Sequence, residues 1–333
     1  MKKILLATTM LAGTAGFAAA EVAVSGYAEI GIIKSDNGFA GSTNAQFHQD
    51  VEVTFKMSGE TDGGLSFGAA IDLDETNVAN GDDSGTTVFV SGAFGKITMG
   101  DTDGALDWAV ADSGSLTSLG DDHTSHLYYF AANGLDGSHD NQVVRYEYSF
   151  GDFGVAVSVE QANNNATGTR QDDNIGIGAT YSMDMGGTAL RFGIGYQSGS
   201  SDAANEALDN TANNGIYTNG DVIGISVKAE LAGGFTAALG YTSTDFDALN
   251  VAGAASNEVD FDHTGLGLTY TTGALSLHAN VGMYDPAVGA SDETYGLAVN
   301  YDLGGGAVVM AGYGSDVGAA GDSSYSIGLG LSF

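Results

Sequence analysis

Ser323–Phe333 reads SSYSIGLGLSF, and this last segment of the chain decides the predicted fold. Side chains alternate across a β-strand, so the odd-numbered residues from Tyr325 to Phe333 form one apolar face. The even-numbered residues are all Ser or Gly and form the other face. A soluble protein rarely ends on an unprotected apolar strand, whereas in a membrane barrel the last strand pairs with the first. We therefore predict that this segment closes a transmembrane β-barrel by pairing with Val22–Ile33.

The first twenty residues have the features of a secretory signal peptide. Lys2 and Lys3 precede the apolar run Ile4–Phe17, and three alanines stand directly before Glu21. No later segment approaches the roughly 18 consecutive apolar residues that a membrane-spanning helix needs. We predict that residues 1–20 are cleaved during export and that residues 21–333 form the barrel domain.

The composition is strongly acidic. The chain has 42 Asp and Glu against 9 Lys and Arg, for a net charge of -33. Removal of Lys2 and Lys3 leaves 9 − 2 = 7 basic residues and a net charge of -35. A surface that binds nucleic acid needs clustered bases, so this charge excludes nucleic acid as a partner and favours cations. The chain has no cysteine, so no disulfide framework is possible.

One pattern repeats along the chain: an alternating strand, a short Gly or Asp turn, a second strand and a longer polar loop. The segment 190–197 is representative, because Leu, Phe, Ile and Tyr alternate with Arg191, two glycines and Gln197. About sixteen such strands can be counted. A soluble β-sandwich alternates in the same way, but the signal peptide, the terminal strand and the number of strands favour an all-β, up-and-down antiparallel transmembrane barrel. About sixteen strands leave an open, water-filled lumen.

The connection 102–141 interrupts this pattern, since about forty residues pass without a clear strand pair. It contains apolar anchors that a disordered loop would lack. The aromatic anchors are Trp108, Tyr128, Tyr129 and Phe130. We predict that this connection, the constriction loop, folds inward and narrows the lumen.

Three blocks of the chain resemble a known family. They are Val88–Asp101 (VFVSGAFGKITMGD), Glu21–Gly26 (EVAVSG) and Tyr301–Gly306 (YDLGGG). All three are similar to segments of general porins of the Rhodobacter type, and the resemblance is spread over residues 21–333. It implies a sixteen-stranded, homotrimeric channel in the outer membrane of a Gram-negative bacterium, surrounded by lipid and lipopolysaccharide. It also implies passive diffusion of ions and small hydrophilic solutes, and that Phe333 belongs to the signal read by the barrel assembly machinery.

This chain departs from that family in the charges of its first two strands. Where family members carry arginines on the wall, it has Glu29, Asp50 and Glu52, all on the predicted inner face. The remaining inward bases are few: Lys56, Arg145, Arg191 and Lys228. We therefore predict a cation-selective pore. A substrate-specific channel for a small cationic or polar solute is the alternative.

The constriction loop is also rich in acids. The loop acids are predicted to form an acidic lip on the constriction, and they are Asp101, Asp103, Asp107, Asp112, Asp121 and Asp122. Asp101, Asp103 and Asp107 could instead hold Ca²⁺, which takes clustered carboxylates and carbonyls. The family requires no cofactor. No nucleophile elbow or other catalytic set stands out, so the chain is not predicted to be an enzyme.

Overall fold

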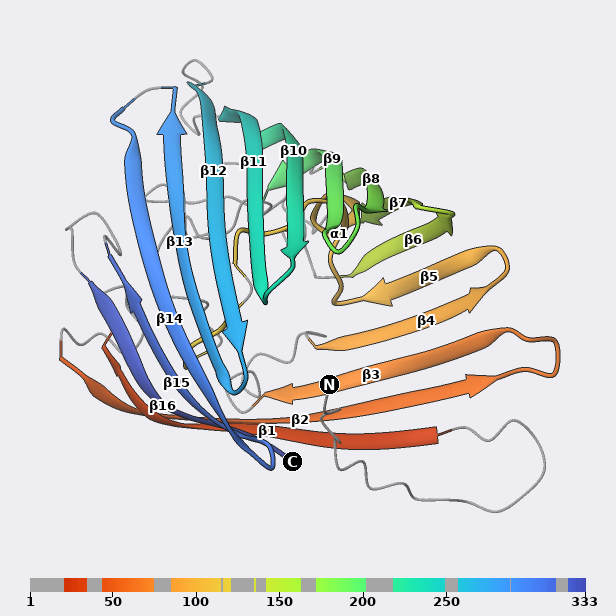
Figure 1. The fold of residues 1–333 in the computed structure, drawn as a ribbon. Coiled ribbons are helices and arrows are strands. Elements are labelled where there is room, and N and C mark those ends of the chain that lie inside the picture. The colour runs from red at the N-terminus through yellow and green to blue at the C-terminus, as the bar shows by residue number, and fades with distance from the viewer. Residues whose placement is uncertain are drawn as a thin grey trace, which may run out of the picture.

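The structure, a computed structural model, is a closed barrel of sixteen strands (Figure 1). It describes residues 21–34, 44–74, 85–114, 116–120, 135, 142–162, 172–201, 218–248, 257–287, 289–315 and 323–333. Every strand pairs antiparallel with its neighbours in the chain, and β1 pairs with β16. The predicted all-β, up-and-down antiparallel barrel of about sixteen strands is therefore confirmed. The strands are β1 (Glu21–Lys34), β2 (Gln46–Glu60), β3 (Ser66–Asp74), β4 (Thr86–Gly92), β5 (Gly95–Gly100), β6 (Val143–Phe150), β7 (Phe153–Glu160), β8 (Asn174–Asp184), β9 (Ala189–Ser201), β10 (Thr218–Leu231), β11 (Phe235–Ala248), β12 (Asn257–Thr272), β13 (Leu275–Pro286), β14 (Asp292–Gly304), β15 (Ala307–Gly314) and β16 (Ser324–Ser332).

The last strand closes the ring as predicted. In the β1–β16 pair, Ile30 stands opposite Leu329 and Lys34 opposite Tyr325. The pairing continues past the end of β16, because the Phe333 N–H donates to the Gly26 carbonyl at 2.8 Å. Closure removes the unpaired backbone groups that an open sheet would expose to lipid.

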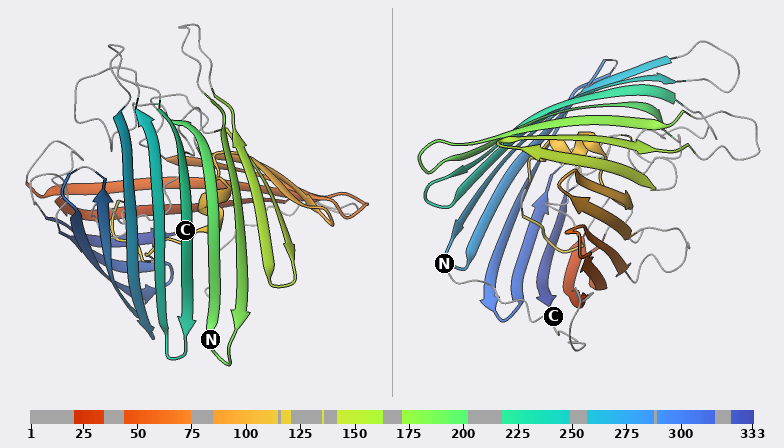
Figure 2. Two further views of the ribbon diagram at one scale, coloured as in Figure 1. Left: turned by 90° about the horizontal axis from the view of Figure 1, so that it is seen from above. Right: turned by 90° about the vertical axis from the view of Figure 1, so that its right-hand side faces the viewer.

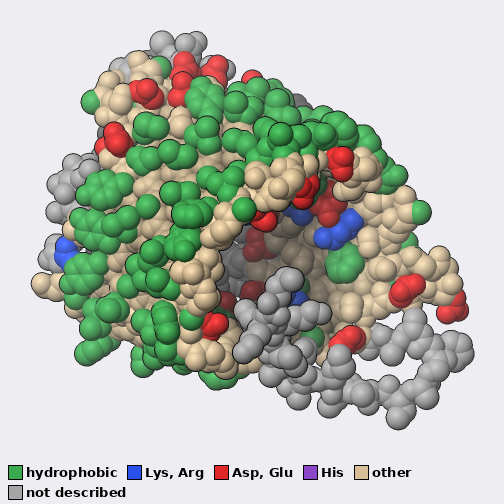
Figure 3. Space-filling view, viewed as in Figure 1, with side chains coloured by type: hydrophobic (Ala, Val, Ile, Leu, Met, Phe, Trp, Pro, Cys, Tyr) green, Lys and Arg blue, Asp and Glu red, His purple; other side chains and the backbone are tan. Residues whose placement is uncertain are grey.

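The two faces of the wall differ as the alternation predicts. Large apolar side chains cover the outside, among them Ile175 and Ile177 of β8, whereas their neighbours Gly176 and Gly178 are buried inside the ring. Figure 3 shows the hydrophobic sheath on the outer surface and Lys, Arg, Asp and Glu side chains within the opening. An apolar exterior with a polar interior is the arrangement that a membrane barrel with an aqueous lumen requires.

Short turns join the strands at one end of the barrel. In the β8–β9 turn, Gly186 and Gly187 have φ of 68° and 104°, a region that residues with a Cβ rarely adopt. The strand ends that the longer connections join lie at the opposite end of the barrel (Figure 2), and most residues of these connections fall outside the described part of the chain. The ends are therefore called the short-turn end and the long-loop end below.

A single turn of helix, α1 (Ala105–Ala109), is described in the constriction loop, and it lies inside the ring against β7, β8 and β9 (Figures 1 and 2). Ala105, Leu106 and Ala109 are fully buried there. Among the described residues, no helix has the length and hydrophobicity needed to cross a membrane.

Candidate functional site

The constriction loop is seated on inward-facing glycines of the wall. Residues 105–113 and 118–119 pass in turn over β8, β9, β10, β12, β15 and the β16–β1 pair. At three of these glycines a Cβ would overlap a carbonyl oxygen of the loop: Gly178 against Ala105, Gly193 against Ala109, and Gly267 against Ser113. Glycine is the residue that permits such close backbone approach. The predicted inward folding of the loop is thus explained by a track of small wall positions.

Polar side chains of the wall hold the loop backbone along this track. The Ala105 N–H donates to the Ser158 hydroxyl at 2.8 Å, and the Ala111 N–H donates to the Ser226 hydroxyl at 2.7 Å. Further along, the Asn300 amide donates to a loop carbonyl, that of Thr117, at 3.0 Å. These bonds satisfy backbone groups that the loop would otherwise bury without partners. The loop is therefore fastened to β7, β10 and β14 by side chains, in addition to its apolar contacts.

Two of the predicted pore-lining bases support the loop as well. Arg145 donates to the Asp103 carbonyl, and Arg191 Nη2 donates to the Trp108 carbonyl at 2.7 Å. Arg145 also lies 3.5 Å from Glu147, which pairs in turn with Lys96 at 3.4 Å. Much of the positive charge on this wall is therefore engaged with loop carbonyls and with Glu147. These contacts could not be read from the sequence, because they depend on the path of the loop.

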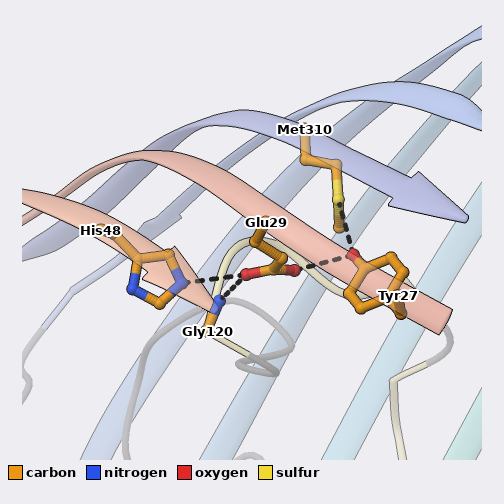
Figure 4. Close-up of polar contacts among 5 residues, drawn as sticks. All are labelled: Tyr27, Glu29, His48, Gly120 and Met310. Carbon is orange, nitrogen blue, oxygen red and sulfur yellow. Dashed lines mark hydrogen bonds and ion pairs between the residues drawn. The ribbon is translucent and has the colours of Figure 1, made fainter. Parts of the chain in front are cut away.

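The segment 116–120 of the loop is bound by Glu29 of β1 (Figure 4). The Glu29 side chain is buried, and its Oε2 accepts the Gly120 N–H at 2.6 Å and lies 3.1 Å from His48 Nε2. Its Oε1 accepts the Tyr27 hydroxyl at 2.7 Å, and this hydroxyl also lies 3.5 Å from Met310 Sδ. Glu29 faces inward, as predicted, but it serves as an acceptor for the loop and for neighbouring wall side chains.

Replacing Glu29 with alanine should release the segment 116–120 of the constriction loop from β1. A hydrogen bond to a charged group contributes about 1.5–3 kcal/mol, so the Gly120 amide should exchange its hydrogen roughly ten- to a hundredfold faster. Hydrogen–deuterium exchange of the segment 116–120 measures this. Glu29→Gln keeps an acceptor and should change exchange less, and Glu52→Ala is a control on the same wall. Equal exchange in Glu29→Ala and the parent would contradict the role assigned to Glu29.

The remaining acids of this wall stand beside Glu29 on β2 and β3. Asp50 is the register partner of Glu29, and Glu52 is that of Tyr27, so both face inward as predicted. Sequence reasoning missed Asp72, which is exposed and accepts the Thr54 hydroxyl at 3.2 Å. Its position could have been inferred, since it alternates with Ile71 of the outward set. The inner face of β1–β3 therefore carries at least four carboxylates.

One lysine lies near these carboxylates. Lys56 of β2 faces inward and is exposed, as predicted. It makes no hydrogen bond or ion pair with any residue that the structure describes. Acids therefore outnumber bases on this part of the wall.

Some of the other predicted site residues lie in the described part of the chain, and some lie outside it. Trp108 anchors the loop as expected, since its ring lies beside Gly154 of β7. Asp107 and Asp112 lie on the loop and are partly exposed. The predicted signal peptide, residues 1–20, lies outside the described residues, and so do five of the predicted loop residues: Asp121, Asp122, Tyr128, Tyr129 and Phe130.

The three aspartates considered for Ca²⁺ are not grouped as metal ligands among the described residues. Asp101 instead accepts the Gly85 N–H at 2.6 Å, which ties the start of the loop to the start of β4. Within the described ranges, no group of three or more His, Asp or Glu side chains is arranged to hold a metal ion. Asp107 lies in α1, which packs against β7, β8 and β9, whereas Asp101 lies beside the start of β4.

Comparison with known proteins agrees with this geometry. Residues 7–318 match the family model described as Gram-negative porin. A porin of Rhodobacter capsulatus is 32% identical over 296 residues, which is 88% of this chain and 93% of that protein. A porin structure refined at 1.8 Å is 28% identical, with a TM-score of 0.67 over 94% of this chain and 100% of that one. A triple mutant of Rhodopseudomonas blastica porin, 20% identical over 94% of this chain and 100% of that one, has a TM-score of 0.60 and shares the fold.

Proposed function

Because the chain belongs to the Gram-negative porin family, and is thus an outer-membrane diffusion channel, we propose that it is a general channel that prefers cations. The observation that supports this preference is the acidic inner face of β1–β3, which carries Glu29, Asp50, Glu52 and Asp72. Carboxylates at the wall of a narrow aqueous passage raise the local concentration of cations and repel anions. The family and the fold indicate a channel rather than an enzyme.

The fastened loop supports passive conduction through a fixed opening. The described part of its backbone is held from β1, β7, β10 and β14, which supports an opening of fixed size. Such a passage sorts solutes by size and charge without a moving part. We propose that ions and small hydrophilic solutes cross it by diffusion.

We further propose that the protein is a homotrimer with contacts on the outward face of β3–β5. β4 and β5 have seven and six residues, fewer than the roughly 9–11 that a tilted strand needs to span a bilayer. Val88 and Phe89 are adjacent on β4 and point to opposite faces of the wall. Val88 is 57% exposed and is the one that faces outward. A neighbouring subunit would cover this short apolar section. Lipopolysaccharide around the remaining sheath, and recognition of Phe333 by the assembly machinery, complete the proposed environment.

Planar-bilayer recordings of the refolded protein test the proposal. In a KCl gradient the reversal potential should have the sign of cation preference, and conductance for larger electrolytes should fall with ion size. Conductance that is ohmic and unsaturated supports a general channel. A reversal potential of the opposite sign would reject cation preference, and a conductance that saturates as the concentration of the permeating salt rises would favour the substrate-specific alternative.

A further inference from the structure

A recess of about 400 Å³ lies in the inner wall at the short-turn end of β8–β10. Its lining includes six charged or polar residues: Asp152, Ser182, Asp184, Arg191, Lys228 and Glu230. Arg191 stands opposite Ser182 on one side and opposite Lys228 on the other. Because Arg191 also holds the Trp108 carbonyl, the recess lies next to α1. A solute that passes the constriction therefore meets it.

The two bases of the recess are incompletely neutralised. Arg191 and Lys228 are register partners, so their Cβ atoms are about 4.5–5.5 Å apart, and like charges in this position repel. Lys228 has no hydrogen bond or ion pair with any part of the chain that is described. Among the described residues, Arg191 makes one side-chain hydrogen bond, to the Trp108 carbonyl, and its guanidinium group has five N–H donors, which leaves donors for a planar anion. A carboxylate bound between them would relieve the repulsion.

Carboxylates flank the same two bases. Glu230 is two residues beyond Lys228 on the same face of β10, about 6.6 Å along the strand. Asp184 and Asp152 are on the exposed rim towards the turns. Of these three acids, only Asp184 has a side-chain bond among the described residues, from the Gly187 N–H at 3.3 Å. The recess thus offers a positive side and a negative side a few ångströms apart.

We propose that this recess binds small zwitterionic solutes of the α-amino-acid type. The solute carboxylate contacts Arg191 and Lys228, and its ammonium group contacts Glu230 and the rim acids. A simple anion meets the acids and a simple cation meets the bases, so the zwitterion is the charge pattern that both sides accept. This inference rests on the proposed channel function and adds to it a binding site that slows the passage of one class of solute.

Glycine is a suitable probe, with acetate and ethylammonium as its two halves. Glycine added from the short-turn side should reduce the ion current in a saturable way, and both halves should do so more weakly. Lys228→Gln and Glu230→Gln should each raise the half-saturating glycine concentration about fivefold, as expected for a partly exposed charge contact. Lys56→Gln is the matched control, because Lys56 is also an inward lysine without a bond to any described residue, and it lies eight strands away on β2. Arg191 is left unchanged because it also supports the loop.

A second readout separates this inference from the channel proposal. Saturation-transfer NMR of glycine with the detergent-solubilised protein detects binding without any current. Conduction without a glycine effect, or acetate acting as strongly as glycine with no change in Glu230→Gln, would overturn the zwitterion site and leave the channel intact. If Lys56→Gln raised the half-saturating glycine concentration as much as Lys228→Gln does, the glycine effect would be a general charge effect and the site would be rejected. Absence of conduction would reject the proposed function, and the NMR signal would still decide whether the recess binds glycine.

Discussion

Replacing Glu52 and Asp72 with lysine should turn the channel from a cation-preferring into an anion-preferring one. Both side chains lie on the inner face of β2 and β3 and reach the lumen, and the double change replaces two negative charges with two positive ones beside Lys56. A unit charge about 4 Å from a passing ion contributes about 1 kcal/mol in water, or roughly fivefold in local ion concentration. Several such charges acting together are sufficient to change the sign of the preference. The reversal potential in a KCl gradient should therefore change sign.

The matched control places the same charges on the outside of the barrel. Asp221 faces outward, where it accepts the Tyr196 hydroxyl at 2.8 Å, and Glu293 is an exposed residue on the outward face of β14. Asp221→Lys with Glu293→Lys alters the net charge equally and should leave the reversal potential nearly unchanged. The effect of the lumen variant should also shrink with added salt, since the screening length falls from about 10 Å at 0.1 M to about 3 Å at 1 M. If both double variants shift the potential alike, the β2–β3 acids do not set the selectivity.

The barrel itself could be predicted from the sequence because its determinants are local. Alternation in 323–333 and in 190–197 assigns each side chain to a face, and each face has a single environment, lipid or water. Closure then follows from the absence of tolerated edges in lipid. For the same reason Glu29, Asp50 and Glu52 were placed correctly on the inner face, and Asp72 would have been found by extending the alternation through β3.

The contacts of the constriction loop could not be predicted in the same way. Arg145 and Glu29 were recognised as inward side chains, but their partners, Asp103 and Gly120, are loop backbone groups that no periodicity locates. The sequence did contain a usable signal in the inward glycines of β8 and β9. Runs of glycine on a lumen face mark where another backbone approaches closely, and here they trace the loop.

Because the loop lies on inward glycines of the wall, Gly193→Ala with Gly267→Ala should lift the loop from the wall. Each new methyl group would overlap a loop carbonyl oxygen, and backbone cannot yield as a flexible side chain can. Overpacking of this kind costs about 1–3 kcal/mol per site, enough to outweigh neighbouring bonds such as that from the Ala111 N–H to Ser226. Because the ring surrounds the loop, the displaced segment can move only into the lumen. Conductance should therefore fall severalfold, with faster hydrogen exchange across 105–113.

The strand ladders do not depend on the loop, so the barrel should still form and resist heat in this variant. Gly26→Ala is the matched control: its Cβ would meet its nearest neighbours, Glu52 and Phe333, at 3.6–3.7 Å, which is ordinary van der Waals contact. Normal conductance is expected there. Unchanged conductance and exchange in Gly193→Ala with Gly267→Ala would mean that the loop is held elsewhere than on the glycine track. Increased conductance would mean that the loop leaves the lumen, and that the wall bonds from Glu29, Ser158 and Ser226 confine it less than their geometry indicates.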